Sequence, residues 1–388
     1  MDSLLFAALP CGRIVHTRTG YDAFVPNPLP PDIFWSDEIV AAVERASLVL
    51  GRLADSLEGE FHIHLPLLFV RDAVGAVRSE GRVISETEYF EALATGEGTS
   101  ATAKLIDNYA ATLEYARRRI EELPLSLRLL RELHLSLLDG VADPCSTPGE
   151  FRRSQNWLGS PGCTLATATF VPPPAAEMRE LLGNWERFLH ESDVLPALVR
   201  LALAHWQYLI LHPFLDMNVL TGSVFAPLIL QHLGVTGRPL PMFGRWLEHN
   251  AGSLQTRVLE VCATGCWEEW LTWYLCGVGD AAQETLDCMT RLRKLHAEQA
   301  GRIETLQSCD EVRHVLDLLH MQPAVTPEWV SEHSDFTPSE AREALEQIES
   351  AGMATRSPSI RGDIYLATGV ITTLETPPPG GHRYALPF

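Results

Sequence analysis

The chain has 388 residues, of which 46% are hydrophobic and 21% are charged. This length allows about two or three domains with a large core, and the composition excludes a disordered chain and a disulfide-stapled miniprotein. The 50 acidic and 30 basic residues give a formal net charge of −20. Such a chain repels a phosphate backbone, so we expect no nucleic acid among its partners.

Neither the cysteines nor the apolar segments indicate export or membrane insertion. The eight cysteines include no Cys-x-x-Cys pair, and free thiols are typical of a reducing compartment. The N-terminal apolar run lacks the basic stretch that precedes it in a signal peptide. The longest apolar stretch, 194–211, is interrupted by Arg200 and His205 and does not predict a membrane span. We expect a soluble, cytoplasmic protein without a membrane partner.

The first 300 residues predict mostly helices. Residues 1–36 are rich in proline and predict a loop, after which Ser36 caps a helix over 37–55. Apolar residues at helical spacing predict further helices over 102–122, 125–140, 175–191, 194–211 and 221–233. Residues 147–174 are rich in Thr, Gly, Pro and β-forming residues and predict a β-hairpin. The alternating pair His62 and His64 predicts a surface strand.

After about residue 305 the predicted elements become shorter. Helices are expected over 309–320, 326–334 and 337–351, followed by a strand–turn–strand stretch over 357–375. This order indicates a winged helix-turn-helix, a module that binds DNA through its third helix. Here that helix exposes four glutamates and one arginine, a surface that phosphates repel. A structural or dimer-forming role is therefore favoured.

The most informative segment, residues 208–223, joins two apolar helices through a polar loop. It resembles the signature of the Fic (Fido) family, His-Pro-Phe-x-Asp-Gly-Asn-Gly-Arg-x-x-Arg. The residues that match are His212, Pro213, Phe214, Asp216 and Asn218. Segments at 122–141, 147–159, 170–174 and 201–214 also look like family segments in family order. The resemblance covers nearly the whole chain.

The resemblance implies a mainly α fold, with a helical Fic core, a β-hairpin flap and a C-terminal winged helix-turn-helix. It divides the chain into an N-terminal helical region at 1–100, the core at 101–304 and a winged-helix-like domain at 305–388. Within the core we call residues 150–174 the flap and residues 212–223 the signature loop. These two segments would form the site.

The resemblance also implies an activity, the transfer of AMP from ATP to a hydroxyl group of a target protein. In such enzymes the residue at His212 is the general base, and the residue at Asp216 holds Mg²⁺. The signature glycines expose backbone N–H groups to the phosphates, and the arginines neutralise them. The target segment lines up along the flap, which includes Phe170.

The chain departs from the signature at the positions that contact phosphate. Met217 and Val219 replace the glycines, and Leu220 and Ser223 replace the arginines. A side chain at positive φ costs about 1–2 kcal/mol, and we expect Val219 to be such an outlier. Each lost arginine removes hydrogen bonds worth about 1.5–3 kcal/mol. We therefore expect no nucleotide cofactor and no metal.

A second segment, residues 72–81, resembles the inhibitory Ser/Thr-x-x-x-Glu-Gly/Asn sequence of many relatives. Ala76 takes the Ser position, and Glu80 and Gly81 end the segment. In those relatives the glutamate pairs with the second signature arginine, which is Ser223 here. We expect Glu80 to have lost its inhibitory role.

What remains is a histidine in a loop that has become apolar. The residues expected to contact a ligand are Trp157, Phe170, Phe214, Met217, Asn218, Val219, Leu220 and Ser223. Three functions stay open. The first is acid/base chemistry by His212 on a largely apolar small molecule, as in specialised biosynthesis. The second is binding or regulation of a partner by a catalytically inactive relative, and the third is AMP or phosphoryl transfer by an altered site. The small-molecule or protein ligand is not specified, and a homodimer also stays open.

Overall fold

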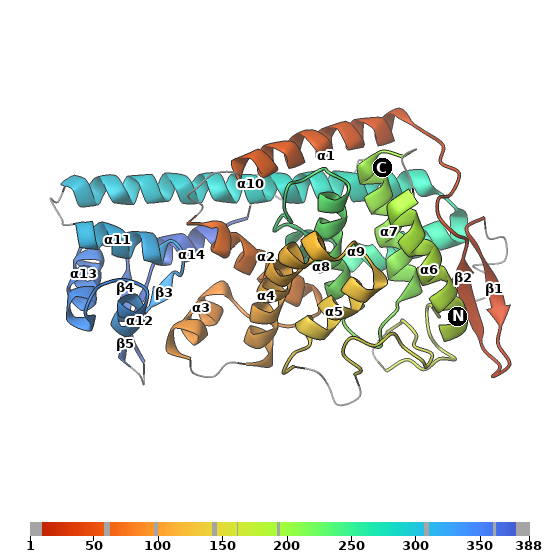
Figure 1. Cartoon of the computed structure of the whole chain (residues 1–388), viewed down its shortest axis with the longest axis horizontal. Helices are drawn as coiled ribbons and strands as arrows, with labels where there is room; N and C mark the ends of the chain where they lie inside the picture. The colour runs from red at the N-terminus through yellow and green to blue at the C-terminus, as the bar shows by residue number, and fades with distance from the viewer. Residues whose placement is uncertain are drawn as a thin grey trace.

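The computed structural model describes residues 10–57, 63–96, 100–141, 146–160, 162–191, 195–305, 310–359 and 362–377. Helices dominate this part of the chain, as expected, and form an elongated molecule (Figure 1). The helices are α1 (Asp37–Ser56), α2 (Leu65–Ser79), α3 (Glu86–Thr95), α4 (Ala101–Glu122), α5 (Leu127–Leu137), α6 (Ala175–Glu191), α7 (Ala197–Leu211), α8 (Asn218–His232), α9 (Phe243–Thr264), α10 (Trp267–Thr305), α11 (Asp310–Leu319), α12 (Pro327–Glu332), α13 (Pro338–Ser350) and α14 (Thr368–Glu375).

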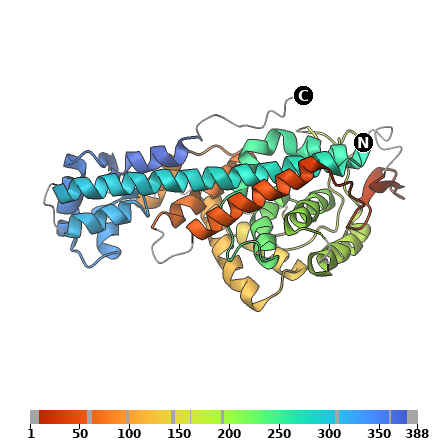
Figure 2. The same cartoon turned by 90° about the horizontal axis from the view of Figure 1, so that it is seen from above.

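The long helix α10 organises the molecule. Helix α1 lies alongside it, as both views show (Figures 1 and 2), and helices α2 to α9 pack beneath the pair. The elements that follow α10 in the chain pack around the C-terminal end of this helix (Figure 1). One cluster of buried apolar side chains runs from Cys11 to Leu374, so the three predicted segments share a core. Their boundaries stay a prediction.

The N-terminal segment contains a hairpin where the sequence predicted only a loop. Strand β1 (Gly12–His16) pairs antiparallel with β2 (Asp22–Pro26), and the backbone N–H of Phe24 donates to the carbonyl of Val171, 2.9 Å away. Phe24 is fully buried. The prediction was wrong because contacts with a segment distant in sequence, rather than local alternation, stabilise this hairpin.

Helix α2, which contains residues 72–79 of the inhibitory-like segment, was not predicted. Residues 71–77 of this helix are buried, and it crosses α9 so closely that a Cβ at Gly244 would lie 1.9 Å from the carbonyl oxygen of Asp72. The predicted surface strand is wrong here, because His64 is buried directly before α2. His62 lies outside the described residues.

Helix α7 explains the longest apolar stretch of the sequence. Almost every side chain of this helix is buried, including Arg200 and His205, since neighbouring helices surround it. The His205 ring lies 2.7 Å from the hydroxyl of Tyr274. Within the described ranges, no helix combines the length and apolarity that crossing a bilayer requires.

The C-terminal elements follow most of the predicted order. After α11 come β3 (Ala324–Val325), α12, α13 and the hairpin of β4 (Thr355–Ser359) and β5 (Gly362–Leu366), with sheet order β3-β5-β4. Residues 368–375 were predicted as strand but form α14, because Val370, Ile371 and Leu374 are buried together on one helical face. The winged-helix assignment stays a prediction.

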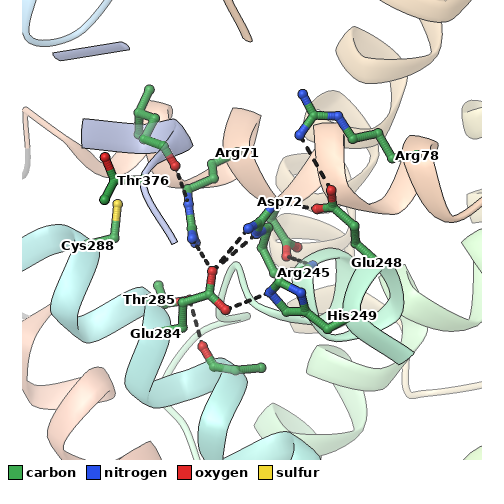
Figure 3. Close-up of polar contacts among 12 residues, drawn as sticks. Arg71, Asp72, Arg78, Arg245, Glu248, His249, Glu284, Thr285, Cys288 and Thr376 are labelled. Atoms are coloured by element: carbon green, nitrogen blue, oxygen red, sulfur yellow. Dashed lines mark hydrogen bonds and ion pairs between the residues drawn. The ribbon is translucent and has the colours of Figure 1, made fainter. Parts of the chain in front are cut away.

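A buried ionic network fixes α2 against α9 and α10 (Figure 3). The Glu284 carboxylate on α10 accepts hydrogen bonds from Arg71, from Arg245 at 3.1 Å and from His249 at 2.8 Å. Arg71 also donates from Nε to the carbonyl of Leu374 in α14, 2.9 Å away. The network therefore holds α2, the helix that leads to Glu80, against the core and the C-terminal elements.

Candidate functional site

The signature loop begins and ends in left-handed backbone. His212, the C-cap of α7, has φ 45°, and Met217, the N-cap of α8, has φ 52°. Met217 thus occupies a conformation that glycine adopts without strain. The expectation for Val219 was wrong, because Val219 lies in the first turn of α8 with ordinary helical backbone. The side chain at positive φ therefore belongs to Met217 and not to Val219.

Asn218 stabilises the signature loop through two hydrogen bonds to the backbone of Phe214. Its Oδ1 accepts from the backbone N–H of Phe214 at 2.9 Å, and its Nδ2 donates to the carbonyl of Phe214 at 3.0 Å. Both groups are buried, and a buried backbone group left without a partner costs about 1–3 kcal/mol. Asn218 therefore fixes the shape of the turn, and its contact with a ligand stays a prediction.

His134 supports the loop from α5, a role that the sequence analysis missed. Its ring stacks on Phe214 with a centroid separation of 3.8 Å and an interplanar angle of 2°. Nδ1 accepts from the backbone N–H of Gly149 at 2.9 Å, which leaves the proton on Nε2, 3.3 Å from the carbonyl of Asp216. Burial lowers the pKa of His134 to about 4, so the ring is neutral at pH 7 and supports the signature loop by stacking and hydrogen bonding.

Arg152 ties the flap to the signature loop. Its guanidinium, fully buried, donates to the backbone carbonyls of His212 at 2.9 Å and Leu211 at 3.3 Å, and also to that of Pro173. The flap itself is looser than the predicted hairpin, since Leu158 and Phe170 form a single β-bridge. Arg152 thus anchors the flap to the end of α7.

A cavity of about 250 Å³ lies beside His212. It is lined by Ser79, Glu80, Leu158, Gly159, Phe170, Leu209, Ile210, His212, Val219, Leu247, Ala251, Leu254, Gln255, Val258 and Leu259. The walls are mainly aliphatic side chains from α7, α8 and α9. Among the lining residues only Glu80 and His212 have titratable side chains. None of the described residues that line the cavity is an arginine or a lysine.

The cavity includes four of the residues singled out from the sequence, His212, Glu80, Val219 and Phe170. The others lie elsewhere. Residues outside the lining are Gly81, Trp157, Phe214, Asp216, Met217, Asn218, Leu220 and Ser223. The six residues that α9 contributes carry no motif, so nothing in the sequence indicated them.

The two positions of the signature arginines point into the core. Leu220 and Ser223 are fully buried. The Ser223 hydroxyl lies 2.7 Å from the carbonyl of Leu220 and 3.3 Å from the hydroxyl of Tyr109, and Tyr109 donates to Asp72 at 3.1 Å. These side chains join α8 to α4 and α2 and do not reach the cavity.

Trp157, which was expected to contact a ligand, and Asp216, which was expected to be a catalytic residue, lie at the surface. Trp157 is 40% exposed and donates from its indole to the carbonyl of Cys163, 3.0 Å away within the flap. Asp216 is exposed, and its Oδ1 accepts from the backbone N–H of Met217 at 2.8 Å. This hydrogen bond holds the backbone of Met217, the N-cap of α8.

The electrostatics of the cavity favour neutral side chains. Burial, reinforced by the charge of Arg152, lowers the pKa of His212 to about 4, against the effect of the Leu209 carbonyl. His212 is therefore a neutral base at pH 7. Burial and the nearby charge of Asp216 raise the pKa of Glu80, while the backbone amide of Leu220 and the charge of Arg82 oppose the shift.

Glu80 has an unsatisfied oxygen. Its Oε1 is buried and has no hydrogen-bond partner within the described part of the chain. The residue follows the last turn of α2, and the amide of Leu220 in the first turn of α8 favours its charged form. The carboxyl group thus stands where a helix N-terminus offers its N–H groups to an anion.

Comparison with known proteins agrees with this architecture. The profile of the Fic/DOC family matches residues 124–230. A Fic family protein from Desulfovibrio desulfuricans G20 has a similar fold, with a TM-score of 0.51 at 16% identity over 88% of this chain and 99% of the other. The described part of the chain therefore has a Fic-like fold. The chain contains a Fic/DOC domain at residues 124–230.

The curated relatives share only part of their length with this chain. The "Protein adenylyltransferase Fic" of Drosophila yakuba is 26% identical over 197 residues, which cover 49% of this chain and 36% of that protein. The protein of the same name from Drosophila ananassae is 30% identical over 118 residues, which cover 30% of this chain and 21% of its own length. The chain thus spans about a third or less of these relatives.

Proposed function

We propose that the cavity beside His212 binds a largely apolar small molecule, and that His212 performs acid/base chemistry on it without a nucleotide. The observation that carries this proposal is a cavity with aliphatic walls and no cationic side chain, in the place where the family resemblance puts the catalytic base. Its volume, about 250 Å³, lies just below the usual range of small-molecule sites, roughly 300–1,000 Å³.

ATP and Mg²⁺, which the family resemblance implies, do not fit the residues present. The positions of the two signature arginines are buried in the core as Leu220 and Ser223, and the phosphates would share the cavity with the acidic residue Glu80. Two phosphate-binding arginines supply several kcal/mol of charge-assisted hydrogen bonding. Nothing among the lining residues replaces them, so we derive no step through the nucleotide.

His212 is suited to accept a proton. Its imidazole stays neutral at pH 7, and Arg152 and Asn218 hold the backbone on either side of the loop in a fixed conformation. A positioned base of this kind contributes about 10²–10⁴-fold to a rate. His212 would take a proton from the bound molecule and return it during the reaction.

Adenylyl transfer is the second candidate, because the curated relatives carry that name and His212, Asp216 and Asn218 match the family signature. The two candidates differ in the ligand that they require. Nucleotide binding decides between them, and that measurement closes the Discussion.

The proton-accepting role of His212 can be tested without a substrate. We expect the imidazole nitrogens of His212 to show neutral chemical shifts from about pH 8 down to about pH 5 in an NMR titration of the histidine side chains, with a pKa near 4. His212→Ala identifies the signal. A pKa at or above the ordinary value of 6.5 would leave His212 largely protonated when the pocket needs a base, and would contradict the proposal.

A further inference from the structure

Three histidines from distant parts of the chain meet where α10 and α11 lie against the start of α2. His64 directly precedes α2, His296 lies on α10, and His320 follows the last turn of α11. The centroids of their rings are 4.7–5.8 Å apart. His64 is 5% exposed, and His320 is fully buried. We call these three residues the histidine cluster.

The hydrogen bonds of the histidine cluster limit how many protons it can bind. Nε2 of His320 lies 2.7 Å from Oε1 of Gln299, an oxygen that can only accept, so this nitrogen carries a proton. Nδ1 of His320 lies 3.0 Å from Nε2 of His64, and in neutral His320 it accepts the proton of His64. If both rings were protonated, two N–H groups would point at each other. The closed cluster therefore excludes at least one proton that separated histidines would bind.

The neighbouring charges do not relieve this exclusion. Asp317, in the last turn of α11, pairs with His296, whose Nε2 lies 2.6 Å from the carboxylate. Burial and the charges of His64 and His296 lower the pKa of His320 to about 3. Other charged groups of α10 and α11 have partners along these helices or in α1: Lys294 with Glu298, Arg313 with Glu304, and Arg293 with the carbonyl of Ser56.

From this geometry we infer that the histidine cluster is an acid-sensitive contact, which holds α11 against α10 and the start of α2 near neutral pH and releases them in acid. The inference does not depend on the ligand bound beside His212. Separated histidines bind protons below about pH 6.5, so the stabilisation by the neutral cluster is present above this pH and is lost as the pH falls. Each excluded proton makes opening about tenfold more favourable at about pH 5.5 than at about pH 7.5.

The opening is local, because contacts without a histidine hold the other C-terminal elements. Arg71 donates to the carbonyl of Leu374 in α14, and Val325 of β3 pairs with Tyr365 of β5. We therefore expect the end of α11 to separate from the start of α2 while the rest of the chain stays folded. Opening frees the first turn of the helix that leads to Glu80 in the cavity wall.

Hydrogen exchange of the full chain, followed by mass spectrometry, tests this inference. After correction for the intrinsic effect of pH on exchange, the protection of peptides from α11 and from the first turn of α2 should fall about tenfold or more between about pH 7.5 and about pH 5.5. Peptides from α7 in the core should be more protected than those from α11 at both pH values, because they exchange through global unfolding.

Variants of the full chain assign the effect to the histidine cluster. In His320→Gln the glutamine can donate to Gln299 and accept from His64 without taking up a proton, so the fall in protection of α11 should shrink to about threefold or less. His64→Gln should have the same effect and provides the test if the first variant does not fold. His314→Gln changes an exposed histidine on the same helix; it is the matched control and should keep the full effect.

Three results would overturn the inference. The first is a protection of α11 that does not change between the two pH values. The second is an unchanged fall in the variants at His320 and His64, which would assign the proton uptake to other groups. The third is an equal protection of α11 and α7 with the same dependence on pH, which would mean that α11 opens only when the whole chain unfolds.

Discussion

Replacing Glu284 with glutamine is expected to lower the free energy of unfolding by about 3–5 kcal/mol, because it leaves buried cations without their partner. Glu284 is 4% exposed, and its carboxylate accepts hydrogen bonds from Arg71, Arg245 and His249. Burial alone would raise its pKa, but the hydrogen bond from His249 and the charges of the two arginines outweigh burial, so its pKa lies below the ordinary value.

Denaturation by urea, followed by circular dichroism, measures this loss. Glu260→Gln is the matched control, because Glu260 pairs with Arg257 at the surface, where an ion pair contributes about 1 kcal/mol or less. Similar losses for the two variants would show that the network in Figure 3 does not hold α2, α9 and α10 together.

Acid is expected to destabilise the protein strongly between pH 6.5 and pH 4. Burial lowers the pKa of His134, His205 and His212 to about 4, and burial together with the charges of neighbouring histidines lowers that of His320 to about 3. In the unfolded chain these groups titrate near 6.5. Their contribution to stability is present above pH 6.5 and is lost as the pH falls towards 4, because the unfolded state then binds more protons.

Carboxyl groups with raised pKa values, among them those of Asp72 and Glu80, oppose this trend. Burial raises the pKa of Asp72 to about 7, against the effects of the Arg245 amide and the Tyr109 hydroxyl. Its contribution is present below its unfolded pKa and is lost as the pH rises through 7. Since each pKa unit corresponds to about 1.4 kcal/mol, four histidines outweigh it.

The measurement is a series of urea denaturation curves at different pH values. We expect the free energy of unfolding to fall by several kcal/mol from pH 6.5 to pH 4. A free energy that is constant or rises over this interval would mean that these imidazoles are protonated in the folded protein.

The sequence predicted those parts of the fold in which local pattern and tertiary packing agree. Ser36 caps α1 as expected, and Thr337 caps α13 at the predicted start of that helix, since both place a capping side chain in front of an apolar helical stripe. Residues 368–375 were wrongly predicted as a strand because they include β-branched residues, which favour strands. Packing of α14 against α10 stabilises a helix instead.

The position of the candidate site in the chain could be predicted from the sequence, but the residues that surround it in space could not. The signature loop led to His212 because five of its residues match a pattern. The same pattern could not show that Leu220 and Ser223 point into the core, since both lie on a helix that is buried on most of its faces. The wall contributed by α9 consists of ordinary aliphatic residues, which only the fold brings to His212.

The position of Glu80 in the fold could not be predicted from the sequence either. The sequence placed it at the end of an inhibitory-like segment and indicated a lost role, because its arginine partner is absent. The structure places it in the wall of the cavity beside His212. Its position depends on how α2 crosses α9 at Gly244, a contact between segments far apart in the chain.

The central claim is that this Fic-fold site has exchanged a phosphate-binding cradle for an apolar cavity. Calorimetric titration of the full chain with ATP and Mg²⁺ tests it most directly. We predict no binding heat up to about millimolar nucleotide, the affinity range that remains when charge-assisted contacts are missing. Saturable binding in the micromolar range, lost in His212→Ala or strengthened in Glu80→Gln, would contradict the account and favour adenylyl transfer.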